Sequence, residues 1–137
     1  MSDPSPRAVF AARLLQARQL RGLSQRALGD RMGLGKEKGS TRVNRYERQS
    51  SAIGFESLET LAQALGVPPA YLLAESAPMA DAILALSGHP EQARLTALLQ
   101  AMQAEPGLAD AVLRLVELPA HERDKALAAL QVVADSK

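Results

Sequence analysis

The sequence predicts an all-α fold, and three observations support this prediction. Apolar residues recur at helical spacing along most of the 137 residues, no segment alternates between apolar and polar residues as a strand does, and glycine or proline separates the periodic stretches. Hydrophobic residues make up 47% of the chain and charged residues 23%, as in average globular domains, so a packed core is expected. The length fits one compact domain, or one small domain with an appended module.

The N-terminal half is expected to contain a flexible leader, residues 1–6, followed by five helices. In the first helix Phe10, Leu14 and Ala17 repeat at helical spacing, and Ser24 is a suitable N-cap for the second. Glycines follow several of these helices because glycine tolerates left-handed backbone. The helices are expected over residues 7–21, 24–32, 40–48, 57–65 and 69–73, with the segment LGKEKG, residues 34–39, as a loop.

The C-terminal half shifts in composition towards alanine and leucine, and four further amphipathic helices are expected there. Residues 78–137 carry a net charge of −3. Their apolar stripes form either an intramolecular core or a subunit interface, because four short helices in about 60 residues make a marginal core alone. The expected domains are the leader 1–6, an N-terminal domain 7–77 and an acidic region 78–137, whose helices span residues 79–86, 91–104, 108–118 and 119–134.

Composition excludes several kinds of site. The chain has no cysteine, which excludes disulfides, thiolate zinc sites and cysteine nucleophiles, and His89 and His121 cannot build a metal site by themselves. No nucleophile–base or carboxylate pair can be placed, so no catalytic residue, metal or cofactor is expected, and the chain is not expected to be an enzyme. No apolar run approaches the roughly 18 residues of a membrane span, and the N-terminus lacks a signal-peptide core. These absences predict a cytoplasmic protein with no membrane partner.

Charge is segregated along the chain. Residues 7–48 contain eleven basic and three acidic residues, a net charge of +8, whereas the whole chain carries +1 and the remainder therefore −7. A basic first third on a nearly neutral chain is typical of a surface that meets a polyanion. Ordinary solvated helix faces would give the same count of charges, so the order of the residues has to distinguish the two interpretations.

The segment LSQRALGDRMG has the features of two helices that cross steeply around a short turn. Such a crossing needs a small residue where the backbones meet, a turn residue that tolerates positive φ, and apolar residues on the second helix that face the first. Gly29 and Gly33 supply the first two, and Val43 and Tyr46 supply the third. At this point the sequence resembles the lambda-repressor-like (XRE-type) helix-turn-helix regulators.

The resemblance covers roughly residues 7–74 and implies roles for several residues. Arg18 occupies the place of a family arginine that pairs with a glutamate at the end of the recognition helix, here Glu47. Gln25 follows the N-cap where the family often has a glutamine that bonds a DNA phosphate. The stretch LETLAQALGV, followed by YLL, is similar to the end of the family domain.

One interruption separates the chain from the family pattern. About ten residues usually lie between the turn glycine and the glutamate, whereas here Gly33 to Glu47 spans fourteen. The four extra residues fall within LGKEKG, which implies a longer and basic turn and leaves the register of the recognition helix open. Gln49 also stands where the family usually has glycine, and Ile53 where it usually has proline.

Aligned on Glu47, the resemblance implies which side chains meet double-stranded DNA. Arginine can form two hydrogen bonds with guanine and asparagine with adenine, while lysine and glutamine suit phosphates. Alternatively, the arginines only line a solvated helix face. The base-reading candidates are Ser40, Thr41, Arg42, Asn44 and Arg45, and the phosphate candidates are Gln25, Arg26, Lys36, Lys38 and Arg48.

What the resemblance implies is a sequence-specific transcriptional regulator, most simply a repressor that binds an operator as a homodimer. The acidic C-terminal helices would then serve dimerisation or bind a partner, since one such module buries little DNA surface. Two alternatives remain open. One is an antitoxin-type autorepressor whose C-terminal helices bind a protein partner, and the other is a helical adaptor that binds proteins and no DNA.

Overall fold

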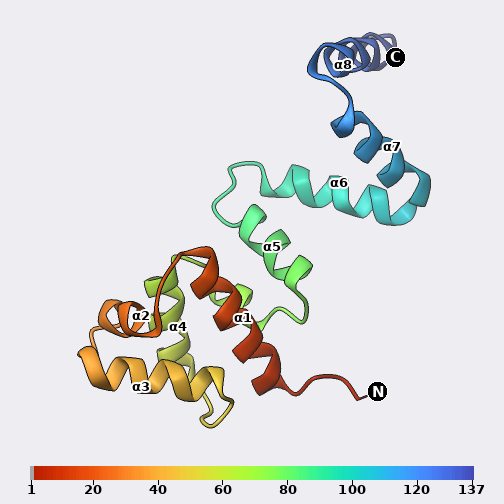
Figure 1. The fold of residues 1–137 in the computed structure, drawn as a ribbon. Coiled ribbons are helices and arrows are strands. Elements are labelled where there is room, and N and C mark those ends of the chain that lie inside the picture. Colours follow the sequence, from red (N-terminus) through yellow and green to blue (C-terminus); the bar gives the residue numbers. More distant parts are fainter. Residues whose placement is uncertain (1) are drawn as a thin grey trace. The chain divides into compact units, whose positions relative to one another are not determined.

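The computed structural model describes residues 2–137, apart from the side chain of Lys36. Within this range the regular structure is entirely helical, which confirms the predicted all-α fold. The chain divides into two compact units, the first ending at His89 and the second spanning Pro90–Lys137. The elements (Figure 1) are α1 (Pro6–Leu20), α2 (Gln25–Arg31), α3 (Lys36–Glu47), α4 (Phe55–Leu65), the 3-10 helix η1 (Pro69–Leu73), α5 (Ala77–Leu86), α6 (Gln92–Ala104), α7 (Pro106–Glu117) and α8 (Ala120–Asp135).

One apolar core joins the elements of the first unit. Leu14 of α1, Leu28 of α2 and Leu61 of α4 are fully buried in it. Phe10 packs edge-on against Tyr46 of α3, with ring centroids 5.7 Å apart. Apolar residues three or four positions apart share one face of each helix, because an α-helix has 3.6 residues per turn. The core therefore fixes which face each helix leaves to solvent.

α2 and α3 cross at two glycines. Gly29 of α2 and Gly39 of α3 are both buried and meet backbone to backbone. The turn between the helices contains Gly33, whose φ of +74° lies in the left-handed region that favours glycine. Gly29 thus lies at the helix crossing, as the sequence predicted, but its partner Gly39 belongs to a segment that was expected to be a loop.

The expectation of a loop over residues 34–39 is wrong. α3 begins at Lys36, behind Gly35 at its N-cap, and continues without a break to Glu47. The four residues beyond the family spacing therefore add about one helical turn to the start of α3 and leave the turn short. Four residues are close to one full turn, so the later residues of α3 keep nearly the same face towards the core.

The leader is shorter than residues 1–6. Ser5 is the N-cap of α1, and its Oγ accepts a hydrogen bond from the backbone N–H of Ala8 at 3.2 Å. Pro6 is the first residue of the helix, a position where its missing N–H costs nothing. The helix therefore begins at Pro6, one residue earlier than predicted.

α5 packs in the first unit, although residues from 78 onward were expected to form a separate region. Ala80 of α5 is fully buried in the core of the first unit. Gln16 of α1 donates from its Nε2 to Oδ1 of Asp81 in α5 over 3.1 Å. The C-terminal unit consequently consists of α6, α7 and α8 alone.

The unit Pro90–Lys137, which is described in full, contains no buried residue. Successive helices pack in order, α6 on α7 and α7 on α8. A group of large apolar side chains nevertheless remains exposed, and it comprises Leu98, Leu99, Leu113, Val116, Leu127, Leu130, Val132 and Val133.

Candidate nucleic-acid interface

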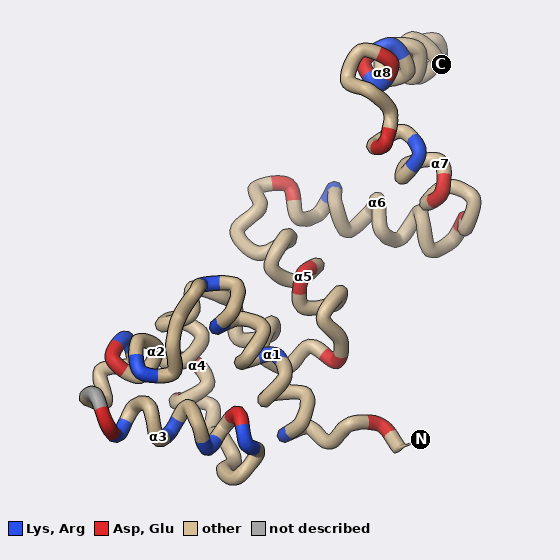
Figure 2. The backbone as a smooth tube through the Cα atoms, in the orientation of Figure 1, with Lys and Arg blue, Asp and Glu red and all other residues tan. Residues whose placement is uncertain are grey.

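The outer face of α3 is a row of exposed polar and basic side chains. Gly39, Val43 and Tyr46 face the core, and this orientation leaves the opposite side of the helix to solvent. Basic residues recur along α3 and α2 (Figure 2). The exposed residues of this face are Glu37, Lys38, Thr41, Arg42, Arg45 and Arg48.

Arg18 and Glu47 join the end of α3 to α1. The Nε of Arg18 lies 2.6 Å from Oε1 of Glu47, and its Nη2 lies 3.4 Å from Oε2, so the guanidinium binds the carboxylate through two nitrogens. Its Nη1 also donates to the carbonyl oxygen of Leu23 at 2.9 Å. The side chains of Arg18 and Glu47 are only 18% and 12% exposed, so water screens the pair weakly. This contact fixes the direction in which the last turn of α3 points.

Gln25, the first residue of α2, extends the same network to the middle of α3. Its Nε2 donates to Oε2 of Glu47 at 2.6 Å, and its Oε1 accepts a hydrogen bond from Nδ2 of Asn44 at 3.4 Å. The carboxylate of Glu47 thus receives hydrogen bonds from α1 and from α2. Since Asn44 uses one N–H in this network, its second N–H and its amide oxygen remain for a ligand.

Hollows lined by described residues border the outer face of α3, one larger and one smaller. The larger lies between α3 and the segment that leads into the first turn of α4, and its far side is formed by Ser51, Ala52, Gly54 and Ser57. The smaller lies between α2 and α3 and is lined by Arg26, Glu37, Ser40 and Thr41. Both hollows are open, which suits a large polyanion that lies across the surface better than an enclosed small ligand.

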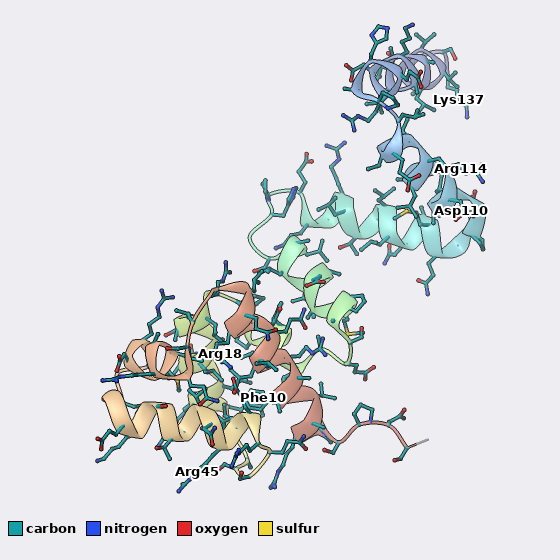
Figure 3. All side chains as sticks on the ribbon, viewed as in Figure 1. Phe10, Arg18, Arg45, Asp110, Arg114 and Lys137 are labelled. Carbon is teal, nitrogen blue, oxygen red and sulfur yellow. The ribbon has the colours of Figure 1, made fainter. Side chains whose placement is uncertain are left out.

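The sequence-predicted site residues occupy different positions on this surface. Among the base-reading candidates, Thr41, Arg42 and Arg45 are exposed, whereas Ser40 and Asn44 are half-buried on the side towards α2. Figure 3 shows Arg45 on the side of α3 that faces away from α1. The phosphate candidates Arg26, Lys38 and Arg48 are exposed, Gln25 is half-buried in the network, and the side chain of Lys36 lies outside the described residues.

The sequence assigns no role to Glu37, nor to Ser51 and Ser57, which line the larger hollow. Glu37 was assigned to a loop, although the insertion of four residues, close to one helical turn, was a signal for an extended helix. Ser51 lies in the connector that follows α3 and Ser57 in the first turn of α4, and neither belongs to a motif, so only the fold places them beside Arg42 and Arg45.

The described residues offer little for other kinds of site. Among them, no group of three or more histidine, cysteine, aspartate or glutamate residues is placed to hold a metal ion. None of the helices in residues 2–137 combines the length and the hydropathy that a membrane span requires.

Comparison with known proteins places this surface in context. Residues 14–72 match a family model described as helix-turn-helix. Among solved structures, the chain is similar to the transcriptional regulator BswR, with 35% sequence identity and a TM-score of 0.60 over 69% of this chain and 97% of that one. A comparison with curated proteins gives no match.

Proposed function

The chain belongs to the XRE-type helix-turn-helix family of DNA-binding transcriptional regulators, and from this we propose that it is a repressor that reads one operator sequence as a homodimer. The observation that carries the proposal is the outer face of α3, where Thr41, Arg42 and Arg45 are exposed on a helix anchored by Arg18 and Glu47. A helix held in this way can enter the major groove with its side chains already placed.

Base reading is proposed for Ser40, Thr41, Arg42, Asn44 and Arg45. Arg42 and Arg45 have the geometry to bind O6 and N7 of guanine, and the free part of the Asn44 amide suits adenine. Because Gln25 holds Asn44 on one side, the amide of Asn44 is oriented before DNA arrives.

Phosphate contacts are proposed for Arg26, Lys36, Lys38 and Arg48, with Gln25 as a neutral donor. Such contacts set the register of the protein on the duplex and supply affinity, but they carry no sequence information. They also release counterions, so binding should weaken steeply with salt. An operator-binding regulator acts where its operator lies, so a cytoplasmic location is part of the proposal.

The experiment is fluorescence anisotropy on the DNA upstream of the gene, over a series of salt concentrations, with a random duplex for comparison. We expect Arg45→Ala to bring the affinities for the two duplexes closer by about tenfold. Arg94→Ala, which removes an exposed arginine from α6, is the matched control and should change neither affinity. Equal binding of the natural protein to both duplexes would exclude sequence-specific reading.

Dimerisation is proposed through the second unit. Because α6, α7 and α8 bury no residue, the exposed leucines and valines of this unit have no core within the unit. A second copy is the occupant that a reader of two half-sites requires.

Light scattering of the full chain at micromolar concentration tests this step. The natural protein should have the mass of a dimer, and the double variant Leu127→Glu with Leu130→Glu should have the mass of a monomer and bind the operator more weakly. His121→Glu, which adds an acid to α8 away from these leucines, should remain a dimer. A monomeric natural protein would favour the antitoxin-type alternative, because the exposed apolar side chains would then be free for a different protein.

A further inference from the structure

We infer that Glu37, in the first turn of α3, is a further base-reading residue that accepts a hydrogen bond from the exocyclic amine of a cytosine. The inference rests on the proposed function, in which α3 enters the major groove. Carboxylates accept a hydrogen bond from N4 of cytosine, which presents this amine in the major groove.

Glu37 lies in the same row of α3 as two proposed base-reading residues. Thr41 follows it by four positions and Asn44 by seven, a spacing that places side chains on one side of an α-helix. Glu37 is exposed and lines the smaller hollow together with Arg26, Ser40 and Thr41. Its carboxylate therefore belongs to the surface that the proposed function turns towards DNA.

Two contacts hold the first turn of α3 in place. The Oγ1 of Thr41 donates to the carbonyl oxygen of Glu37 at 2.9 Å. The backbone contact of Gly39 with Gly29 fixes the same turn against α2. Since an α-helix rises 1.5 Å per residue, Glu37 lies about 6 Å beyond Thr41 along the axis, which corresponds to one or two base pairs.

The hydrogen bond from Thr41 also limits which groups Thr41 can offer to a base. Because its hydroxyl hydrogen is used by the backbone of Glu37, Thr41 can offer a base only a methyl group and an acceptor oxygen. Glu37 is likewise an acceptor. The start of α3 thus offers hydrogen-bond acceptors to the bases, whereas Arg42 and Arg45 offer donors further along the helix.

Charge gives a second reason to assign Glu37 to base reading. The other charged residues described on the outer face of α3 are Lys38, Arg42, Arg45 and Arg48, all basic. A carboxylate among them repels phosphates and so weakens binding to random DNA, whereas a hydrogen bond from a cytosine amine offsets this cost at the correct site. Glu37 would raise specificity through both effects.

A simpler role for Glu37 is to stabilise the start of α3 through the helix dipole. Two variants and a control separate the roles: Glu37→Ala, Glu37→Gln, and Glu122→Gln, which removes the same charge from the first turn of α8. Each full-length protein selects its preferred sites from a pool of duplexes with random sequence, and a thermal melt checks that each is folded.

The natural protein should select cytosine one or two base pairs outward from the position that depends on Thr41. Glu37→Ala should lose about tenfold discrimination at that base pair alone, equivalent to about 1.4 kcal/mol. Glu37→Gln should move the preference towards adenine, which glutamine reads. Glu122→Gln should select the same sites as the natural protein.

If folded Glu37→Ala keeps every base preference and only its melting temperature changes, the helix-dipole role is correct and the inference is wrong. If the natural protein selects no sequence at all, the proposed function fails, and the inference fails with it. The two failures are distinguishable because the first requires a specific natural protein.

Discussion

A methyl group on Gly29 would lie 2.4 Å from the backbone carbonyl carbon of Gly39, so α2 and α3 touch through their main chains. No side chain longer than hydrogen fits between the two helices at this point. A glycine inside a helix costs about 1 kcal/mol relative to alanine, and here the close approach of the two helices offsets that cost. The contact sets the depth at which α3 lies against α2, and hence how far its outer face projects.

Gly39→Ala should therefore destabilise the first unit strongly. Its Cβ would meet the Cα of Gly29 at 2.5 Å, and because both atoms belong to backbones, the helices themselves must separate. We expect a loss of about 3 kcal/mol or more in the free energy of unfolding, measured by urea denaturation. Affinity for the operator should fall together with stability.

Gly107→Ala in α7 is the control for this substitution. Nothing lies within 4 Å of the position that its Cβ would take, and its backbone is helical. Alanine should therefore leave stability unchanged or raise it by about 0.5 kcal/mol. If Gly39→Ala were equally harmless, α2 and α3 could not be in backbone contact in solution.

Arg18→Ala should lower both stability and DNA binding. The variant leaves the carboxylate of Glu47 poorly exposed and without its strongest partner, at a cost of about 3 kcal/mol. It also frees the last turn of α3, so operator affinity should fall more than the unfolded fraction explains. Urea denaturation and anisotropy measure the two effects.

Arg94→Ala removes an arginine from the pair of Arg94 with Glu91, whose side chains are 80% and 53% exposed. Exposed pairs contribute little to stability, so the urea midpoint of this control should stay within error. An unchanged midpoint in Arg18→Ala as well would mean that Arg18 and Glu47 do not interact as the structure places them.

The sequence predicted the helices well and one boundary badly, for a physical reason. Apolar spacing and capping residues are local signals, and they predicted α1, α2, α4 and the C-terminal helices to within about two residues. The first turn of α3 contains Gly39, which local propensity counts against a helix. It forms because Gly29 lies opposite, and that neighbour comes from the fold.

Part of the candidate site can likewise be predicted from the sequence, and part depends on the fold. The identity of the exposed residues on α3 follows from their spacing to Val43 and Tyr46, so the sequence could predict it. The link from Asn44 through Gln25 to Glu47 depends on the angle at which α2 crosses α3, and no spacing in the sequence contains that angle. For the same reason the sequence does not place Glu37 on α3, because the start of this helix at Lys36 depends on the contact with α2.

Gln49→Gly should stabilise the protein. Gln49 follows α3 with a φ of 60°, in the left-handed region that costs a residue with a side chain about 1 kcal/mol. The N–H of Gln49 donates to Tyr46 O at 3.0 Å and that of Ser50 to Arg45 O at 2.9 Å, so the hydrogen bonds that end the helix require this conformation. Glycine should raise the free energy of unfolding by about 0.5–1 kcal/mol.

The control for this variant is the replacement of a glycine that has a positive φ, at the end of α4. Gly66 has a φ of 63°, so Gly66→Ala should cost about 1 kcal/mol in the same urea experiment. Opposite signs for the two variants would establish that the backbone conformation causes both. A loss of stability in Gln49→Gly would instead require that the Gln49 side chain makes a contact worth more than its strain.

Tyr71→Phe should change how stability depends on pH. Tyr71 is fully buried, and this burial raises the pKa of its phenol above the ordinary value of 10.0. The nearby carboxylate of Asp81 raises the pKa further, whereas the positive charges of Arg13 and Arg21 lower it by less. Above pH 10 the unfolded chain loses this proton while the folded chain keeps it, so the free energy of unfolding falls as the pH rises towards the folded-state pKa. Urea denaturation between pH 8 and about 11 should show a shallower decline for Tyr71→Phe than for the natural protein.

Near neutral pH the variant should be at least as stable as the natural protein, because the phenol oxygen has no hydrogen-bond partner among the described residues and phenylalanine leaves no polar atom buried there. Parallel declines in the two proteins would contradict this prediction, because Tyr71 would then ionise as easily in the folded chain as in the unfolded chain.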